Sequence, residues 1–143
     1  MTERSDAVEA AVRALRLRDR SSAELDERLR ARGVEPDERL EVLATLERSG
    51  YVDDVRYAET RAAALAERGS GDAFVRDDLE RRGIAAETIA AAIALLAPER
   101  ERAAQIVARR GASPKTARYL AAKGFDEDVA TAVIAREAHG EVE

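Results

Sequence analysis

The sequence contains no cysteine, no tryptophan and one histidine, and aromatic residues make up 3% of its 143 positions. Without cysteine the chain forms no disulfide and no thiolate metal site, which is compatible with a reducing compartment. His139 lies near the C-terminus, where a solvated role is more common than general-base catalysis. The sequence also lacks the 18 or so consecutive apolar residues of a membrane helix and a secretory signal pattern. We therefore expect a cytoplasmic protein that makes no membrane contact.

Motifs for catalysis are missing as well. The sequence has no glycine-rich phosphate loop, no metal-ligand spacing and no nucleophile motif. Three acidic pairs could be imagined as metal clusters: Asp53 with Asp54, Asp77 with Asp78, and Asp126 with Asp128. Two of the three stand at predicted helix starts, where capping and the helix dipole explain acidic residues. These absences predict a protein that is not an enzyme and has no metal or cofactor.

One pattern occurs three times: an apolar residue, three spacers, leucine, three spacers, glycine and a further apolar residue. The copies are Leu25, Leu29, Gly33, Val34; Val75, Leu79, Gly83, Ile84; and Thr116, Leu120, Gly124, Phe125, with threonine in the first apolar position. The glycines are 50 and 41 residues apart, a spacing typical of stacked helical modules. Because alanine, leucine, glutamate and arginine dominate, the composition also favours helix. We predict an all-α fold of three tandem three-helix repeats, stacked into an elongated, curved structure.

Start and stop signals divide the chain into nine predicted helices. Ser21 and Glu24 form a capping-box pattern for the second helix, Gly33 ends it, and Pro36 suits the first turn of the third. The first helix is expected to begin at Ser5 or Asp6 with Val8, Val12 and Leu15 inward, and the third to bury Leu40, Leu43 and Leu46. The remaining helices are predicted at 53–68, 72–82, 86–96, 98–110, 114–123 and 127–138. The repeats would occupy residues 1–50, 51–97 and 98–139, with fraying after Ala138 and an acidic tail at 140–143.

Two segments carry a resemblance to a known family: GYVDDVRYAE at 50–59 and RSSAELDERLRARG at 20–33. Together they resemble the RecX family of bacterial regulators, which act on the RecA recombinase. The resemblance covers nearly the whole chain, since members of that family also consist of three successive three-helix repeats. It implies a protein that binds RecA and its DNA filament and restrains ATP hydrolysis, strand exchange and filament growth. The implied settings are homologous recombination, DNA repair and the SOS response.

The segment at 50–59 also has a purely structural interpretation. Gly50 can adopt the left-handed conformation that ends a helix, and Tyr51 would then pack back against the last helical turn as an anchor. Val52 would contact Tyr57 in a hydrophobic staple around a cap made by Asp53 or Asp54. The alternative is a direct partner contact by Tyr51 or Tyr57.

Basic residues cluster although the net charge is −5. Between Pro98 and Gly124 there are seven of them against two glutamates, and a smaller run lies in the first helix. The candidate partner- or nucleic-acid-binding residues are Arg109, Arg110, Lys115, Arg118 and Lys123, with Arg16, Arg18 and Arg20 as a second set. Either cluster could instead be a solvated helix face.

The acidic balance argues for a protein partner, since proteins that bind only nucleic acid are more commonly basic. We expect a monomer that binds RecA and the RecA–DNA filament, with weak direct DNA contact, by lying in the filament groove or by capping a growing end. Two alternatives stay open. One is a helix-turn-helix-like DNA-binding protein using residues 22–33 and 36–49, and the other is a helical-repeat adaptor for an unrelated protein.

Overall fold

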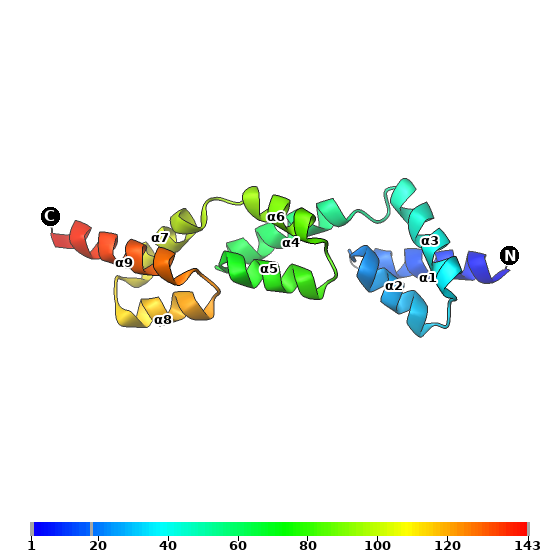
Figure 1. Ribbon diagram of the computed structural model, residues 1–143, viewed down its shortest axis with the longest axis horizontal. Coiled ribbons are helices and arrows are strands. Elements are labelled where there is room, and N and C mark those ends of the chain that lie inside the picture. The colour runs from blue at the N-terminus through cyan, green and yellow to red at the C-terminus, as the bar shows by residue number, and fades with distance from the viewer. Residues whose placement is uncertain (1, 18, 143) are drawn as a thin grey trace.

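The computed structural model describes residues 2–17 and 19–142, and this part of the chain forms nine α-helices without a strand. The helices are α1 (Thr2–Leu17), α2 (Ser22–Ala31), α3 (Pro36–Arg48), α4 (Asp54–Glu67), α5 (Asp72–Arg81), α6 (Ala86–Ala94), α7 (Glu99–Arg110), α8 (Pro114–Ala122) and α9 (Glu127–Val142). They follow one another as three groups of three along an elongated molecule, with the termini at opposite ends (Figure 1). The predicted all-α helical-repeat fold is confirmed. We call α1–α3, α4–α6 and α7–α9 the first, second and third repeat; the exact residue boundaries given above stay a prediction.

Each repeat has a hydrophobic cluster of its own. In the second repeat the cluster joins α4, α5 and α6 through residues such as Leu65, Leu79 and Ile89, which are 3% exposed or less. Corresponding clusters surround Leu29 in the first repeat and Leu120 in the third. All the closely packed helix pairs lie within one repeat. The apolar core is therefore divided into three parts, and the repeats depend less on apolar neighbour interfaces than stacked modules usually do.

Glycines end the middle helix of each repeat in the same way. Gly33, Gly83 and Gly124 have φ angles of 84°, 79° and 88°, in the left-handed region that favours glycine. The residue after each glycine donates its backbone N–H to the carbonyl of the leucine in the repeated pattern, at 3.0–3.1 Å. This arrangement closes the last helical turn and turns the chain toward the next helix.

Three predictions on the first repeat are wrong in detail. Leu40 is 69% exposed and Val42 takes its place in the core, whereas Leu46 is buried as predicted and Leu43 packs against the cluster. Leu40 lies two residues before Val42, which is about 200° around a helix, so it points away from the core. In α1, Ala7, Ala11 and Ala14 form the buried face, while Val8, Val12 and Leu15 pack against it and stay partly exposed. That helix begins at Thr2 rather than at Ser5 or Asp6.

The C-terminal prediction also needs correction. Helix α9 runs to Val142 and passes Ala138, where the sequence predicts fraying. It includes Gly140, which is exposed and has no atom within 4 Å of the position a Cβ would take. A glycine weakens a helix without ending it. Of the predicted acidic tail, Glu143 lies outside the described residues.

Candidate functional site

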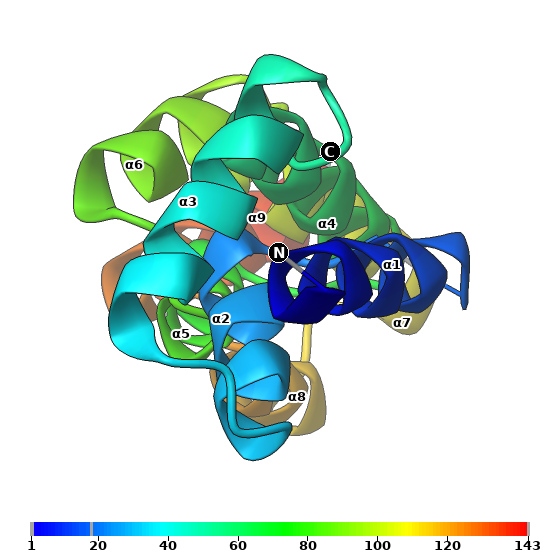
Figure 2. The ribbon, with the colours of Figure 1, turned by 90° about the vertical axis from the view of Figure 1, so that its right-hand side faces the viewer.

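The three middle helices, α2, α5 and α8, are arranged end to end. The C-terminus of α5 meets the N-terminus of α2, and the C-terminus of α8 meets the N-terminus of α5. Along the long axis of the molecule these helices lie behind one another in the lower part of the view (Figure 2). At the first joint the Ser21 hydroxyl donates to the Arg82 carbonyl at 2.6 Å. At the second joint the Gly71 N–H donates to the Lys123 carbonyl at 2.8 Å. Free carbonyls at one helix end thereby meet donors at the next, which also aligns the helix dipoles head to tail.

At each joint, a carboxylate at the start of the following repeat's first helix forms additional hydrogen bonds. Asp54, at the start of α4, accepts hydrogen bonds from the N–H and hydroxyl of Ser22 at 2.8 and 2.7 Å. Glu99, at the start of α7, accepts one from the Asp72 N–H at 2.6 Å. Both acidic side chains therefore cap a helix that belongs to the preceding repeat, where the helix dipole favours negative charge.

The segment at 50–59 thus contributes to the first joint. Asp53 caps its own helix by accepting from the Arg56 N–H at 3.0 Å, whereas Asp54 binds across the joint. Tyr57 is 9% exposed, and its hydroxyl accepts from Arg82 at 2.9 Å. Burial raises the pKa of Tyr57, so the phenol stays neutral at physiological pH.

The predicted role of Tyr51 as an anchor is wrong, because 54% of this residue is exposed. Gly50 does end α3 with a positive φ of 78°, but Val52 takes the buried position in the cluster of the first repeat. Tyr57 belongs to the cluster of the second repeat, so Val52 and Tyr57 do not share one core as a staple would. The turn after Gly50 connects two repeats, and its apolar residue falls one position later than in the turns within repeats.

Asp78 is the most strongly bound carboxylate near the first joint. It accepts two hydrogen bonds from Arg61, at 3.0 and 2.9 Å, and one from Arg82 at 2.9 Å. Its side chain is 8% exposed. The hydrogen bonds from Arg61, aided by Arg82, hold the pKa of Asp78 below its usual value. Asp78 thus pairs with both arginines of its own repeat, and Arg82 also pairs with Glu24 of the first repeat at 3.5 Å.

The second joint contains a comparable pair, Arg102 with Asp72. Arg102 is 9% exposed, donates to the Asp72 carboxylate at 2.9 and 2.6 Å, and also binds the Ser70 carbonyl. Burial raises the pKa of Asp72 even though the charge of Arg102 opposes that shift. Arg102 belongs to the basic stretch seen in the sequence, but its charge is used inside the molecule.

The predicted partner-facing residues of the third repeat lie on α7 and α8 and just beyond α8. Arg109, Arg110, Lys115 and Arg118 are exposed, and Lys123 is half-buried. The guanidinium of Arg110 lies over the Tyr119 ring, 3.7 Å from its centroid. Within the described part of the chain none of these five cations forms an ion pair with a carboxylate.

Two of these five cations, Arg109 and Arg110, line a pocket at the second joint. Its lining includes Arg109, Arg110 and Tyr119 from the third repeat, together with Glu67, Arg68 and Gly69 at the end of α4. Lys123 and Tyr119 also come within 4 Å of the place a Gly69 side chain would occupy. Lys115 and Arg118 lie outside the pocket lining. The sequence missed Arg68, because only the fold brings the end of α4 beside α7 and α8.

The second set of predicted binding residues, Arg16, Arg18 and Arg20, does not form one cluster among the described residues. Arg16 is exposed and lines a shallow pocket with Tyr51 and Arg56, while Arg20 donates to the Ala14 carbonyl at 3.3 Å. Arg18 lies outside the described residues. Arg16 and Arg20 therefore serve different surroundings and do not line one pocket together.

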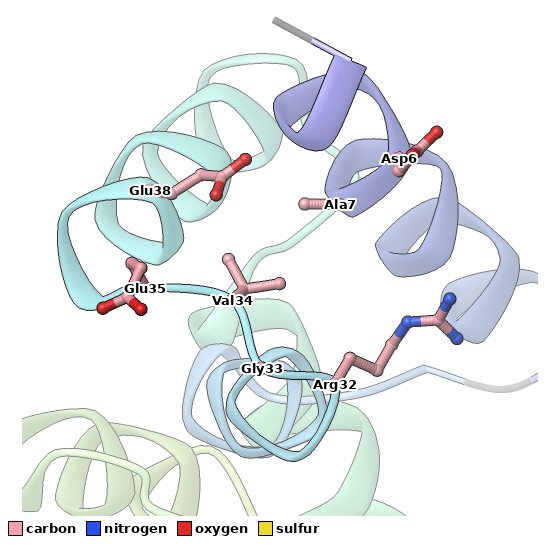
Figure 3. A pocket seen from close by; sticks show the side chains of 7 residues that line it. All are labelled: Asp6, Ala7, Arg32, Gly33, Val34, Glu35 and Glu38. Carbon is pink, nitrogen blue, oxygen red and sulfur yellow. The ribbon is translucent and has the colours of Figure 1, made fainter.

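A further pocket marks the N-terminal end of the stack. Its lining residues come from α1, the turn after α2 and the start of α3: Asp6, Ala7, Arg32, Gly33, Val34, Glu35 and Glu38 (Figure 3). Gly33 has nothing within 4 Å of its Cβ position, whereas Gly83 and Gly124 face the preceding repeat. The first repeat is thus open at the glycine position that the second and third repeats use for contact with a neighbour. Three carboxylates line the pocket against one arginine.

The described residues offer no metal site and no membrane-spanning helix. They contain no group of three or more acidic, histidine or cysteine side chains placed to hold a metal ion. None of their helices combines the length and the apolar character needed to span a bilayer.

Comparisons with known proteins give the family. Residues 53–93 match the family model described as "RecX, second three-helix domain". A "Regulatory protein RecX" of Chromohalobacter salexigens is 37% identical over 125 residues, which cover 81% of this chain and 82% of the relative. The chain belongs to the RecX family. A protein of the same name from Stenotrophomonas maltophilia is 34% identical over 85% of this chain and 80% of its own length.

Solved RecX structures share the fold. The crystal structure of RecX from Lactobacillus salivarius aligns with a TM-score of 0.84 and 20% identity, covering 96% of this chain and 97% of that one. A second crystal structure, titled as a regulatory protein RecX, gives a TM-score of 0.78 at 19% identity over 92% of this chain and 72% of the other. The order of three three-helix repeats is therefore shared although most residues differ.

Proposed function

We propose that this protein regulates, mainly by inhibition, the RecA recombinase. It binds RecA and the RecA–DNA filament as a monomer and restrains ATP hydrolysis, strand exchange and filament growth during homologous recombination, DNA repair and the SOS response in the cytoplasm. The observation that carries the proposal is membership of the RecX family over more than four fifths of the chain.

The geometry supports a binding role along a larger assembly. The molecule is elongated, its cores are closed within the repeats, and a cluster of exposed cations lies on the surface of the third repeat. Exposed arginines and lysines attract a partner electrostatically and speed its association, whereas a buried cleft for chemistry would need converging reactive groups. Several modest contacts along one elongated molecule add up through high effective concentration.

The helix-turn-helix alternative receives less support from the structure. Its second helix, α3, contains Asp37, Glu38, Glu41 and Glu47 against Arg39 and Arg48, a charge of −2. Moreover, the side chain of Arg39 is bound to Asp26 at 2.9 Å. An acidic helix is repelled by phosphates, so its entry into a DNA groove would be opposed. The other alternative, an adaptor for an unrelated protein, predicts that the chain has no effect on RecA activity.

The test is a steady-state RecA ATPase assay on single-stranded DNA with the protein titrated in. Inhibition near one molecule per RecA subunit supports binding along the groove, and inhibition far below that ratio supports capping of a filament end. No change in ATPase activity and no filament binding would overturn the proposal.

A matched pair of double variants locates the contact. Reversing Arg109 and Arg110 to glutamate should weaken inhibition about tenfold or more, because two charge-assisted contacts are lost. Reversing Arg28 and Arg30 on α2 changes the net charge by the same amount on the first repeat and should leave inhibition nearly unchanged. Equal weakening by both pairs would show an effect of net charge instead of a local contact.

A further inference from the structure

The middle helices of the second and third repeats differ at one position: the second repeat has a carboxylate that pairs with arginines, and the third repeat has a tyrosine. Counting back five residues from the glycine that ends the middle helix gives Asp78 in the second repeat and Tyr119 in the third. Asp78 binds Arg61 and Arg82 within its own repeat. A phenol has no charge to offer in its place, so the third repeat lacks the internal carboxylate that the second repeat has.

The cations around Tyr119 are correspondingly unpaired. Arg110 stacks on the Tyr119 ring, and neither Arg109 nor Lys123 has a carboxylate partner among the described side chains. Arg68 and Glu67, from the end of α4, complete the pocket, so that its lining contains three arginines and one glutamate. Its volume of about 350 Å³ leaves space for a side chain from another molecule.

We infer that this pocket binds an aspartate or glutamate side chain of a protein partner, which supplies from outside the carboxylate that Asp78 supplies inside the second repeat. The guanidinium groups of Arg109 and Arg110 would receive it, one of them already oriented by Tyr119. Arginine suits this role because its planar fork can donate two parallel hydrogen bonds to one carboxylate. The inference deepens the proposed function by naming the chemistry that the partner presents at this joint.

Charge favours a carboxylate over a nucleic-acid backbone as the ligand. A phosphate strand would approach a chain whose net charge is −5, and the third repeat also carries the acidic start of α9, where Asp126, Glu127 and Asp128 are exposed. A single acidic side chain enters the pocket without bringing a row of further charges close to these residues. Glu67 also opposes an anion, which limits the pocket to a modest affinity.

The probe for the test is a blocked hexaglutamate peptide, titrated into the full chain labelled with ¹⁵N at physiological salt. We expect saturable shifts of the arginine side-chain signals of Arg109 and Arg110. Tyr119→Asp places a carboxylate at the position of the third repeat that corresponds to Asp78. This carboxylate should pair with the pocket arginines and lower the affinity for the peptide about tenfold or more. Thr131→Asp makes the same charge change on an exposed position of α9 outside the pocket lining and should keep the affinity within about twofold.

A second variant covers the case in which Tyr119→Asp does not fold. Arg109→Gln alters only an exposed side chain and should also weaken peptide binding several-fold. Three results would overturn the inference: no saturable shifts, equal weakening by Thr131→Asp, or tighter binding of hexathymidylate at the same arginines, which would make the pocket a phosphate site. The peptide measurement contains no RecA, so its failure with RecA inhibition intact leaves the proposed function standing. Peptide binding without any effect on RecA would remove the proposed function alone.

Discussion

Replacing Gly83 by alanine should weaken the first joint, and the loss can be separated from the ordinary effect of removing a glycine. Gly83 has a φ of 79°, and a Cβ there would overlap the Cβ of Ala23 at the start of α2. The left-handed backbone costs an alanine about 1–2 kcal/mol, and overpacking at a close contact costs about 1–3 kcal/mol. The total expected loss in the free energy of unfolding is about 2–5 kcal/mol.

Gly33 supplies the matched control. It occupies the same position of the first repeat with a φ of 84°, but nothing lies within 4 Å of its Cβ position. Gly33→Ala should therefore cost only the backbone term of about 1–2 kcal/mol. The difference between the two variants measures the cost of the overlap with Ala23, and therefore how tightly the first joint holds the two repeats together.

Urea unfolding followed by far-ultraviolet circular dichroism measures both losses, and small-angle scattering reports whether the molecule bends. A third variant sharpens the experiment: Ala23→Gly removes the Cβ atom that Gly83→Ala would strike, although it costs about 0.5–1 kcal/mol by itself in a helix. The double variant should recover most of the overlap penalty, which appears as a favourable coupling energy. Equal losses for Gly33→Ala and Gly83→Ala, or no recovery on adding Ala23→Gly, would refute the role assigned to the joint.

Two further predictions concern the second repeat. Leu79→Ala should cost about 2–5 kcal/mol in urea unfolding because Leu79 is fully buried, whereas Leu40→Ala, at a residue 69% exposed, should stay within about 0.5 kcal/mol; similar losses would contradict the assigned burial. Asp78→Asn should cost about 2 kcal/mol at neutral pH, less than a fully buried pair because Arg61 and Arg82 keep 27% and 24% exposure. Since the folded state lowers the pKa of Asp78, its stabilisation is present above the unfolded value of about 3.9 and is lost as pH falls further, so the variant should show a flatter acid limb in unfolding measured against pH. Parallel pH profiles for the two proteins would contradict this assignment.

Much of the fold could be predicted from local sequence, because helix ends are local events. The capping box of Ser21 and Glu24 is present, with the Glu24 N–H donating to Ser21 and the Ser21 N–H donating to Glu24. The glycines that end the middle helices adopt the left-handed conformation that only their lack of a side chain makes inexpensive. Errors arose where opposite faces of one helix both carry apolar residues, as at Leu40 and Val42.

The joints could not be predicted in the same way. Asp54 binds Ser22 from 32 residues away, and Glu99 binds the N–H of Asp72 from 27 residues away. An acidic residue in the first turn of a helix is adequately explained by its own helix dipole, so nothing in the sequence signals that it caps a different helix. The basic pocket was partly visible, since Arg109 and Arg110 stand out as a pair. The difference between Asp78 and Tyr119 acquires meaning only when the repeats are aligned and the partners of Asp78 are known.

The confinement of the apolar clusters within repeats has a mechanical consequence. Flexing the molecule lengthwise would strain the hydrogen bonds and ion pairs at the two joints, while the apolar cluster inside each repeat would keep its packing. Bending is thus concentrated at two places, and a small change of angle there moves the far end of the molecule through a much larger arc. Such a change of curvature does not require any repeat to unfold.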